Sequence, residues 1–226
     1  MRLVRGRAKT PETDRESSRR VLSWVDDHDE VAIRAWQPPR HVAFGRRDAN
    51  EAGYEEAVSR ARRHNYPAVE RNVGGRAVAY TGTTVAFARY EPIDDARTGI
   101  DDRYEALLAD AERALAAAGV EADRGEPPNA FCPGDHSLQH GGRKLAGLAQ
   151  RVTAAAAVTS GILVLDDRVE FATVIGDVYD ALGVPFDPAT VGSVAHAGGD
   201  VEATLPALES ALARGATPDP LPLRQI

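Results

Sequence analysis

Two kinds of hydrophobic spacing occur along the chain, and together they predict a mixture of helices and strands. Apolar residues recur every three or four positions over residues 100–118 and are followed by Gly119, which predicts a helix with a glycine stop. Residues 31–36 instead alternate between the two faces of an extended chain and predict a strand. Helices and strands do not alternate strictly, so we expect an α+β domain with a mixed sheet packed against helices.

The same reasoning places the other elements and the domain limits. We expect residues 1–15 to form a flexible N-terminus, residues 16–216 a single catalytic domain and residues 217–226 a C-terminal tail. The remaining helices are expected at 17–26, 49–64, 172–182 and 201–214, and the remaining strands at 41–44, 68–73, 77–80, 84–88, 144–152 and 161–165.

Composition narrows the class of protein. The net charge is −7, which argues against nucleic-acid binding as the primary role, because nucleic-acid binders carry a basic face. No run of 18 apolar residues is present, so no membrane span is predicted. A single cysteine cannot form an internal disulfide. We expect a cytoplasmic protein.

The first candidate site is a pair of glycines, Gly74 and Gly75, between two strand-like runs. Such a turn lets the backbone approach a ligand closely, and Arg71 and Arg76 add permanent positive charge beside it. A hairpin turn with solvated arginines is the alternative. The segment lacks the Gly-Lys-Ser/Thr ending of a phosphate-binding loop and does not open a helix, so neither that loop nor a dinucleotide fold is indicated.

The second candidate is Lys144, one of only two lysines beside 25 arginines. It lies between Gly142 and Gly147 at the start of a predicted strand. A lysine held there can stabilise negative charge that develops during acyl transfer. An ordinary turn lysine is the alternative.

The third candidate is the loop that holds the only cysteine, Cys132. A thiolate accepts acyl groups well when a neighbouring cation or histidine favours it. A cysteine used as a small apolar residue is the alternative. Cys132, His136 and His140 are a weaker metal-binding hypothesis, because no fourth ligand follows at a familiar spacing.

Taken in order, these segments resemble the lipoate–protein ligase A and octanoyltransferase group of the biotin/lipoate protein ligase superfamily. Residues 34–46 are similar to the first strands of that group. Residues 71–78 resemble its Arg-Arg-x-Ser/Thr-Gly-Gly-Gly/Arg-Ala-Val motif, and residues 142–150 its Gly-Arg/Lys-Lys-x-x-Gly-x-Ala-Gln motif. The resemblance extends over residues 31–165 and implies a class II synthetase-like biotin/lipoate ligase catalytic domain.

The resemblance also implies an activity, which is transfer of a lipoyl or octanoyl group to a lysine of a lipoyl domain. That domain belongs to a 2-oxoacid dehydrogenase or a glycine-cleavage protein. The chain lacks the length for the accessory domain of larger ligases, so we expect that domain to be either absent or a separate accessory subunit. The ligase branch uses ATP and Mg²⁺ to make an acyl-adenylate, whereas the octanoyltransferase branch uses a cysteine thioester. No metal-ligating residue is assigned. The implied catalytic residues are Lys144 and Cys132, and the implied substrate- or ATP-binding residues are Arg71, Gly74, Gly75, Arg76, Ala77, Val78, Ala79 and Gly147.

Three functions are consistent with the sequence. We favour ATP-dependent ligation with Lys144 on the acyl carbonyl, because the Phe-Cys-Pro-Gly context of Cys132 does not clearly match the thioester subgroup. An octanoyltransferase with Cys132 as nucleophile is the first alternative. A non-catalytic subunit that binds lipoate or a lipoyl domain is the second, because Glu70, Val73 and Tyr80 replace usual motif residues. Biotin ligation is weaker, since its Gly-Arg-Gly-Arg-x-Gly-Arg motif is not found.

Overall fold

Residues 1–71 and 75–226 are described in the computed structural model of the chain, and they build two sheets with helices packed on them. The α-helices are α1 (Pro11–His28), α2 (Tyr54–Arg63), α3 (Ile100–Ala117), α4 (Arg168–Leu182) and α5 (Val201–Ala213). The strands are β1 (Arg2–Arg5), β2 (Ala32–Trp36), β3 (His41–Phe44), β4 (Ala68–Glu70), β5 (Val78–Tyr80), β6 (Thr84–Pro92), β7 (Asp123–Arg124), β8 (Ser137–His140), β9 (Arg143–Val152), β10 (Ala156–Val164) and β11 (Asp219–Pro222).

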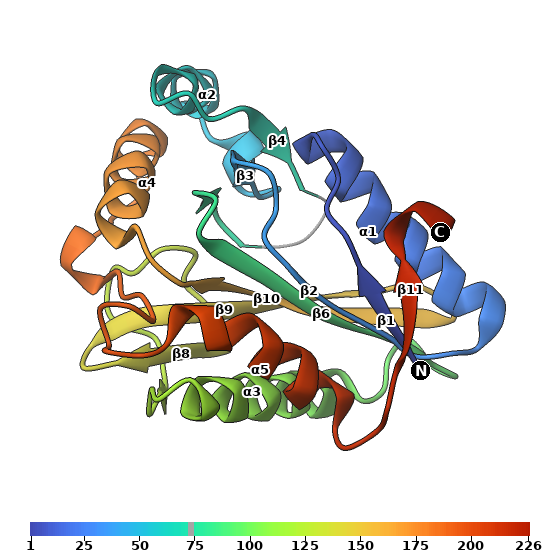
Figure 1. The fold of residues 1–226 in the computed structure, drawn as a ribbon. Coiled ribbons are helices and arrows are strands. Elements are labelled where there is room, and N and C mark those ends of the chain that lie inside the picture. Colours follow the sequence, from blue (N-terminus) through green and yellow to red (C-terminus); the bar gives the residue numbers. More distant parts are fainter. Residues whose placement is uncertain (72–74) are drawn as a thin grey trace.

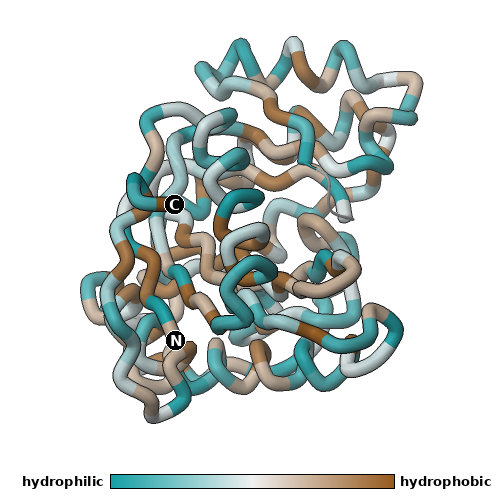
Figure 2. The backbone as a smooth tube through the Cα atoms, turned by 90° about the vertical axis from the view of Figure 1, so that its right-hand side faces the viewer, coloured by the Kyte–Doolittle hydropathy of each residue, from teal (hydrophilic) through white to brown (hydrophobic). Residues whose placement is uncertain are grey.

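The larger sheet separates two layers of the molecule. Its strand order is β11-β1-β2-β6-β10-β9-β8-β7, and the smaller sheet has the order β4-β3-β5. Helices α3 and α5 cover one face of the large sheet, whereas α1 and the small sheet, backed by α2 and α4, lie over the other (Figure 1). Hydrophobic segments gather where these layers meet (Figure 2). The expected α+β class with a mixed sheet is confirmed.

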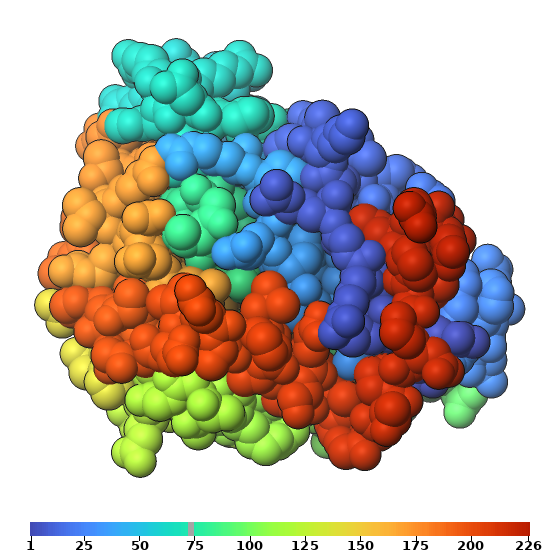
Figure 3. Space-filling model, viewed as in Figure 1, coloured from blue at the N-terminus to red at the C-terminus, as the bar shows by residue number. Residues whose placement is uncertain are grey.

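Both chain ends contribute a strand to the large sheet, within the segments that the sequence analysis assigned to a flexible N-terminus and a C-terminal tail. Strand β1 pairs in parallel with β11 and with β2. The two terminal segments run side by side on one face of the molecule (Figure 3). Neither terminal segment shows a clear alternation of apolar and polar residues, and here the pairing partner decides the conformation.

Helix α1 begins six residues earlier than expected, at Pro11 instead of residue 17. The hydroxyl of Thr10 accepts a hydrogen bond from the amide of Thr13 at 3.2 Å, and Pro11 occupies the first helical position. Its buried face includes the polar residue Asp14, which a search for apolar spacing passes over.

The continuous helix expected over residues 49–64 is divided. A short 3-10 turn covers Asp48–Asn50, and α2 starts only at Tyr54. Gly53 lies between them, and a Cβ on this glycine would be 1.8 Å from the carbonyl oxygen of Ala181 in α4. The break therefore lets the start of α2 approach α4 more closely than a side chain would allow.

A β-bulge in β9 decides which way the lysine of the second motif points. Leu138 of β8 pairs with Ala146, but the next residue, Gln139, pairs with Lys144, so Leu145 is an extra residue. Side chains alternate between the faces of a sheet, and one extra residue shifts that alternation by one. Lys144 consequently shares a face with Gly147.

Candidate active site

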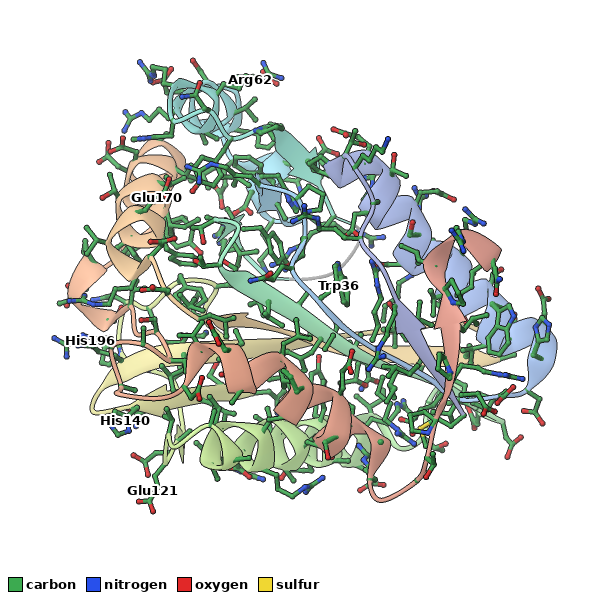
Figure 4. All side chains as sticks on the ribbon, in the orientation of Figure 1. Trp36, Arg62, Glu121, His140, Glu170 and His196 are labelled. Carbon is green, nitrogen blue, oxygen red and sulfur yellow. The ribbon has the colours of Figure 1, made fainter. Side chains whose placement is uncertain are left out.

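A pocket of about 420 Å³ lies between α1, the small sheet and the large sheet. This volume falls in the range of small-molecule sites, roughly 300–1,000 Å³. Part of its wall is apolar, with Trp36, Tyr90 and Ile162 among the lining side chains. Figure 4 shows Trp36 in the space between α1 and the sheets, whereas the other labelled side chains lie toward the outside. The pocket can therefore accept an aliphatic chain.

Cys132 lies in the wall of this pocket, next to the first motif. Its Sγ accepts a hydrogen bond from the guanidinium of Arg71 at 3.3 Å. A Cβ on Gly75 would be only 2.7 Å from the same sulfur, and Gly75 has φ +92°, so only glycine fits there. The glycine pair, the arginine and the cysteine thus converge, although Gly74 itself lies outside the described residues.

The guanidinium of Arg71 is a permanent positive charge next to the sulfur of Cys132. Burial lowers the pKa of Arg71, but the neighbouring Cys132 and Tyr80 raise it, and on balance the pKa lies above its ordinary value. The guanidinium also donates to the carbonyl of Arg76 at 2.7 Å. A fixed cation beside a cysteine favours negative charge on the sulfur and is typical of reactive cysteines.

Lys144 lies beneath the cysteine loop and is fully buried. Its ammonium donates to Oε2 of Glu126 at 2.6 Å and to the carbonyl oxygen of Cys132 at 2.9 Å. A Cβ on Gly147 would be 3.3 Å from the same nitrogen, so the glycine leaves room for the lysine. The structure brings Lys144, Cys132 and Gly147 together as expected, but it directs the ammonium to the backbone of the cysteine loop.

The remaining residues of the first motif are turned away from the pocket. The guanidinium of Arg76 binds Oε1 of Glu51 at 2.6 Å and Oδ1 of Asp48 at 3.3 Å. The side chains of residues 77–79 are buried in the core beneath the small sheet. Direct substrate contacts by Arg76, Ala77, Val78 and Ala79 stay a prediction from the sequence.

Tyr80 and His41 form a second wall of the pocket. Their rings stack with centroids 4.6 Å apart. Burial raises the pKa of Tyr80 to about 12, against the opposing effect of Arg71, so its phenol stays protonated. Burial likewise lowers the pKa of His41, although the carbonyl of Pro39 opposes this. Both rings are therefore neutral at pH 7.

The metal-binding alternative is not supported by the geometry of the described residues. His136 stacks on Tyr104 with ring centroids 3.8 Å apart, while Nδ1 of His140 contacts the carbonyl of Glu121 at 2.7 Å. Across residues 1–71 and 75–226, no group of three or more His, Cys, Asp or Glu side chains is arranged to hold a metal ion.

Two residues of the site were missed by the sequence analysis. Tyr179, on the buried face of α4, accepts a hydrogen bond from the amide of Cys132 at 2.7 Å and donates one to the carbonyl of Ala77 at 3.0 Å. Nothing in its local sequence marks it. Glu126 had a weak signal, as a carboxylate directly before two prolines in the loop that leads to Lys144.

Comparison with known protein families gives a match over most of the chain. A model described as the lipoyl protein ligase A/B catalytic domain matches residues 11–201. An octanoyl-[GcvH]:protein N-octanoyltransferase from Geobacillus kaustophilus is 32% identical over 122 residues, which are 54% of this chain and 43% of that protein. A lipoyl-[GcvH]:protein N-lipoyltransferase from Listeria monocytogenes is 24% identical over 152 residues, 67% of this chain and 55% of that protein. The chain spans about half the length of the curated relatives that it matches.

Solved structures share the fold. A lipoate-protein ligase A bound with ATP superimposes with a TM-score of 0.75 at 17% identity, over 97% of this chain and 88% of that one. A bi-partite lipoate protein ligase from Thermoplasma acidophilum gives a TM-score of 0.71 at 16% identity, over 97% and 86%. No helix in the described parts of the chain has the length and apolarity needed to cross a membrane.

Proposed function

Because the chain belongs to the lipoyl protein ligase A/B catalytic domain family, we propose that it transfers an octanoyl or lipoyl group to a lysine of a lipoyl domain, with the acyl group held as a thioester on Cys132. The observation that carries this proposal is the contact between Sγ of Cys132 and Arg71 in the wall of the pocket. The sequence alone favoured ATP-dependent ligation, whereas this geometry favours the thioester route.

The transfer has two steps, both centred on the sulfur. The thiol gives up its proton to solvent, and the thiolate attacks the acyl carbonyl of the donor. A carbon–sulfur bond forms, the bond between the acyl carbon and the donor nitrogen or sulfur breaks, and the leaving amine or thiol takes up a proton from solvent. The neutral amine of the acceptor lysine then attacks the thioester carbonyl and an amide forms. The carbon–sulfur bond breaks, the thiolate is released, and the proton lost by the amine goes to solvent. Arg71 stabilises the sulfur anion before the first step and after the second.

Lys144 acts on the loop that carries the nucleophile. Its ammonium is held by Glu126 and fixes the carbonyl of Cys132. This arrangement supports a role in keeping Sγ near Arg71 and the pocket, since small displacements of reacting groups slow catalysis strongly.

The ligase alternative needs ATP and Mg²⁺, and the pocket has groups for both. Arg15, Arg19 and Arg151 line it and suit phosphate groups. Two carboxylates line it, and Asp14 is already bound by Arg34 and Trp36, so Asp135 is the one open to Mg²⁺. One carboxylate with phosphate oxygens is a usual magnesium environment, so these residues fit the cofactors.

The acceptor that we propose is the lipoyl domain of a 2-oxoacid dehydrogenase or of a glycine-cleavage protein. The names of two relatives contain octanoyl-[GcvH] and lipoyl-[GcvH], which supports proteins of this kind as partners in acyl transfer. The Thermoplasma neighbour is described as bi-partite. A second polypeptide that completes the activity is the corresponding proposal for this chain.

Intact mass spectrometry tests the mechanism. The protein is incubated without ATP with octanoyl-GcvH or, separately, with octanoyl acyl carrier protein. We expect an increase of one octanoyl group that hydroxylamine removes, and its absence in Cys132→Ala; the chain has no other cysteine that could carry the thioester. Lipoyl-domain modification that requires ATP and octanoate, and that persists in Cys132→Ala, would overturn the thioester route in favour of the ligase.

A further inference from the structure

The hydroxyl of Tyr179 joins the first motif to the loop that carries the nucleophile. It accepts from the amide of Cys132 at 2.7 Å and donates to the carbonyl of Ala77 at 3.0 Å. Arg71 makes the parallel connection one residue earlier, from the carbonyl of Arg76 to Sγ of Cys132. Two consecutive carbonyls of the first motif are thus linked to the same cysteine by two side chains.

The backbone of Cys132 needs such support because its conformation is unfavourable. Its φ is +42°, in the left-handed region that side chains with a Cβ rarely adopt. Residues in this region persist when their surroundings over-determine them, and they concentrate at functional sites. Here Tyr179 holds the amide of Cys132 and Lys144 holds its carbonyl, one on each side of the strained residue.

We propose that Tyr179 is a positioning residue for the Cys132 nucleophile, which rests on the transfer function proposed above. It is not one of the residues that line the pocket, so it acts through Cys132 and not on the substrate. Its contact also occupies the amide of Cys132, which leaves that amide unable to stabilise the oxyanion of the reacting carbonyl.

The simpler explanation is that a buried tyrosine needs partners for its hydroxyl. Tyr179 is fully buried, and its ring packs edge-on against Phe186 at a centroid distance of 5.5 Å. Burial and the nearby Cys132 raise the pKa of Tyr179, so the group remains a neutral hydroxyl that donates and accepts at once. A merely structural tyrosine would support folding without setting the reactivity of the thiol, and this difference can be measured.

The test is Tyr179→Phe, which removes the hydroxyl and keeps the ring. Two quantities are measured: the rate of alkylation of Cys132 by iodoacetamide as a function of pH, and kcat and KM for octanoyl transfer. In this variant the buried amide of Cys132 loses its hydrogen-bond partner, so Cys132 is held less firmly beside Arg71. We therefore expect the alkylation profile to move to higher pH, and kcat to fall at least about tenfold with KM nearly unchanged. Tyr66→Phe is the matched control, since Tyr66 is also fully buried in the same core cluster and its hydroxyl has no partner among the described residues.

The outcomes separate this inference from the proposed function. An alkylation profile and kcat in Tyr179→Phe equal to those of the wild type and of Tyr66→Phe would overturn the positioning role, even where the thioester forms. A wild type that forms no thioester would overturn the function, while the alkylation profile would still decide the role of Tyr179. If Tyr179→Phe does not fold, 3,5-difluorotyrosine at position 179 keeps the ring and weakens the hydroxyl as an acceptor. The alkylation profile should then shift in the same direction, and an unchanged profile would contradict the inference.

Discussion

Both faces of the large sheet bury ion pairs, but among the described residues the pair beside the cysteine loop keeps an unpartnered atom, whereas the pair between α3 and α5 does not. On the face covered by α3 and α5, the carboxylate of Asp110 is bound by Arg113 and by both Nε and the terminal nitrogen of Arg214. On the pocket face, Lys144 is bound to Glu126, yet Oε1 of Glu126 and Nε of Arg71 have no hydrogen-bond partner within the described residues.

The difference indicates which face is built for a ligand. Buried polar atoms are normally satisfied, and each exception in a folded protein calls for an explanation such as a bound group. Nε of Arg71 and Oε1 of Glu126 both lie next to the cysteine loop that lines the pocket. Burial of a charge by itself therefore does not mark a functional site, whereas burial with unsatisfied atoms beside a cavity does.

Lys144→Met, on the pocket face, should have the largest effect on both stability and acyl transfer. Glu126 loses its partner, and because Glu126 is partly exposed we expect a loss of about 3 kcal/mol of unfolding free energy, the lower end for a broken buried pair. Release of the Cys132 carbonyl should also slow acyl transfer roughly 100-fold. Urea unfolding and the transfer rate of the folded fraction measure the two effects.

Asp110→Asn is the corresponding change on the helical face and should separate stability from activity. The amide still accepts from the arginines, whose side chains are partly exposed, so we expect a loss of about 1–2 kcal/mol. The transfer rate of the folded protein should equal that of the wild type. A rate that falls as far as in Lys144→Met would contradict the assignment of function to one face.

A smaller effect on stability is expected from the strained backbone of Cys132. Cys132→Gly and Cys132→Ala both remove the thiol, but only glycine relaxes at φ +42°. The left-handed region disfavours alanine by about 1–2 kcal/mol, and the greater unfolded-state entropy of glycine offsets part of this. We therefore expect the glycine variant to be more stable by about 1 kcal/mol in thermal or urea unfolding. An alanine variant of equal or higher stability would mean that the backbone is not strained.

The smallest expected effect is a pH dependence of the free energy of unfolding that comes from His41 on the pocket face. Burial lowers the pKa of His41 below its ordinary 6.5. The unfolded chain then binds a proton below about pH 6.5 that the folded protein does not, so stability is present above this pH and decreases as the pH falls below it. His41→Phe keeps a ring against Tyr80 and should flatten the decrease, as measured by urea unfolding between about pH 7.5 and 5.5. A slope unchanged from the wild type would assign the dependence to other groups.

Much of the fold could be predicted because its longer elements carry clear periodicity. Helix α3 ends one residue from the expected position, and β3 has the expected bounds. The membership of the superfamily group, expected from two short motifs in order, is confirmed by the family match. The short strands β1, β7, β8 and β11 were missed because their sequences show no clear alternation, and their conformation comes from pairing with other strands.

The sequence indicated several residues that lie together in the structure, but not the contacts between them. Cys132, Lys144, Gly75 and Arg71 were all expected, and they do converge. The hydrogen-bond partners of Lys144 were not predictable, because the direction of its side chain depends on the β-bulge at Leu145 in β9.

The sequence by itself determined the class of fold, the family and the chemical types at the site, because periodicity and motifs are local properties of the chain. Tertiary structure alone decided that Lys144 binds the backbone of the cysteine loop, that Arg71 lies beside the sulfur, and that Tyr179 joins the first motif to that loop. These contacts connect residues that are far apart in the chain, and their geometry follows from the packing of α4 and the two sheets around the pocket.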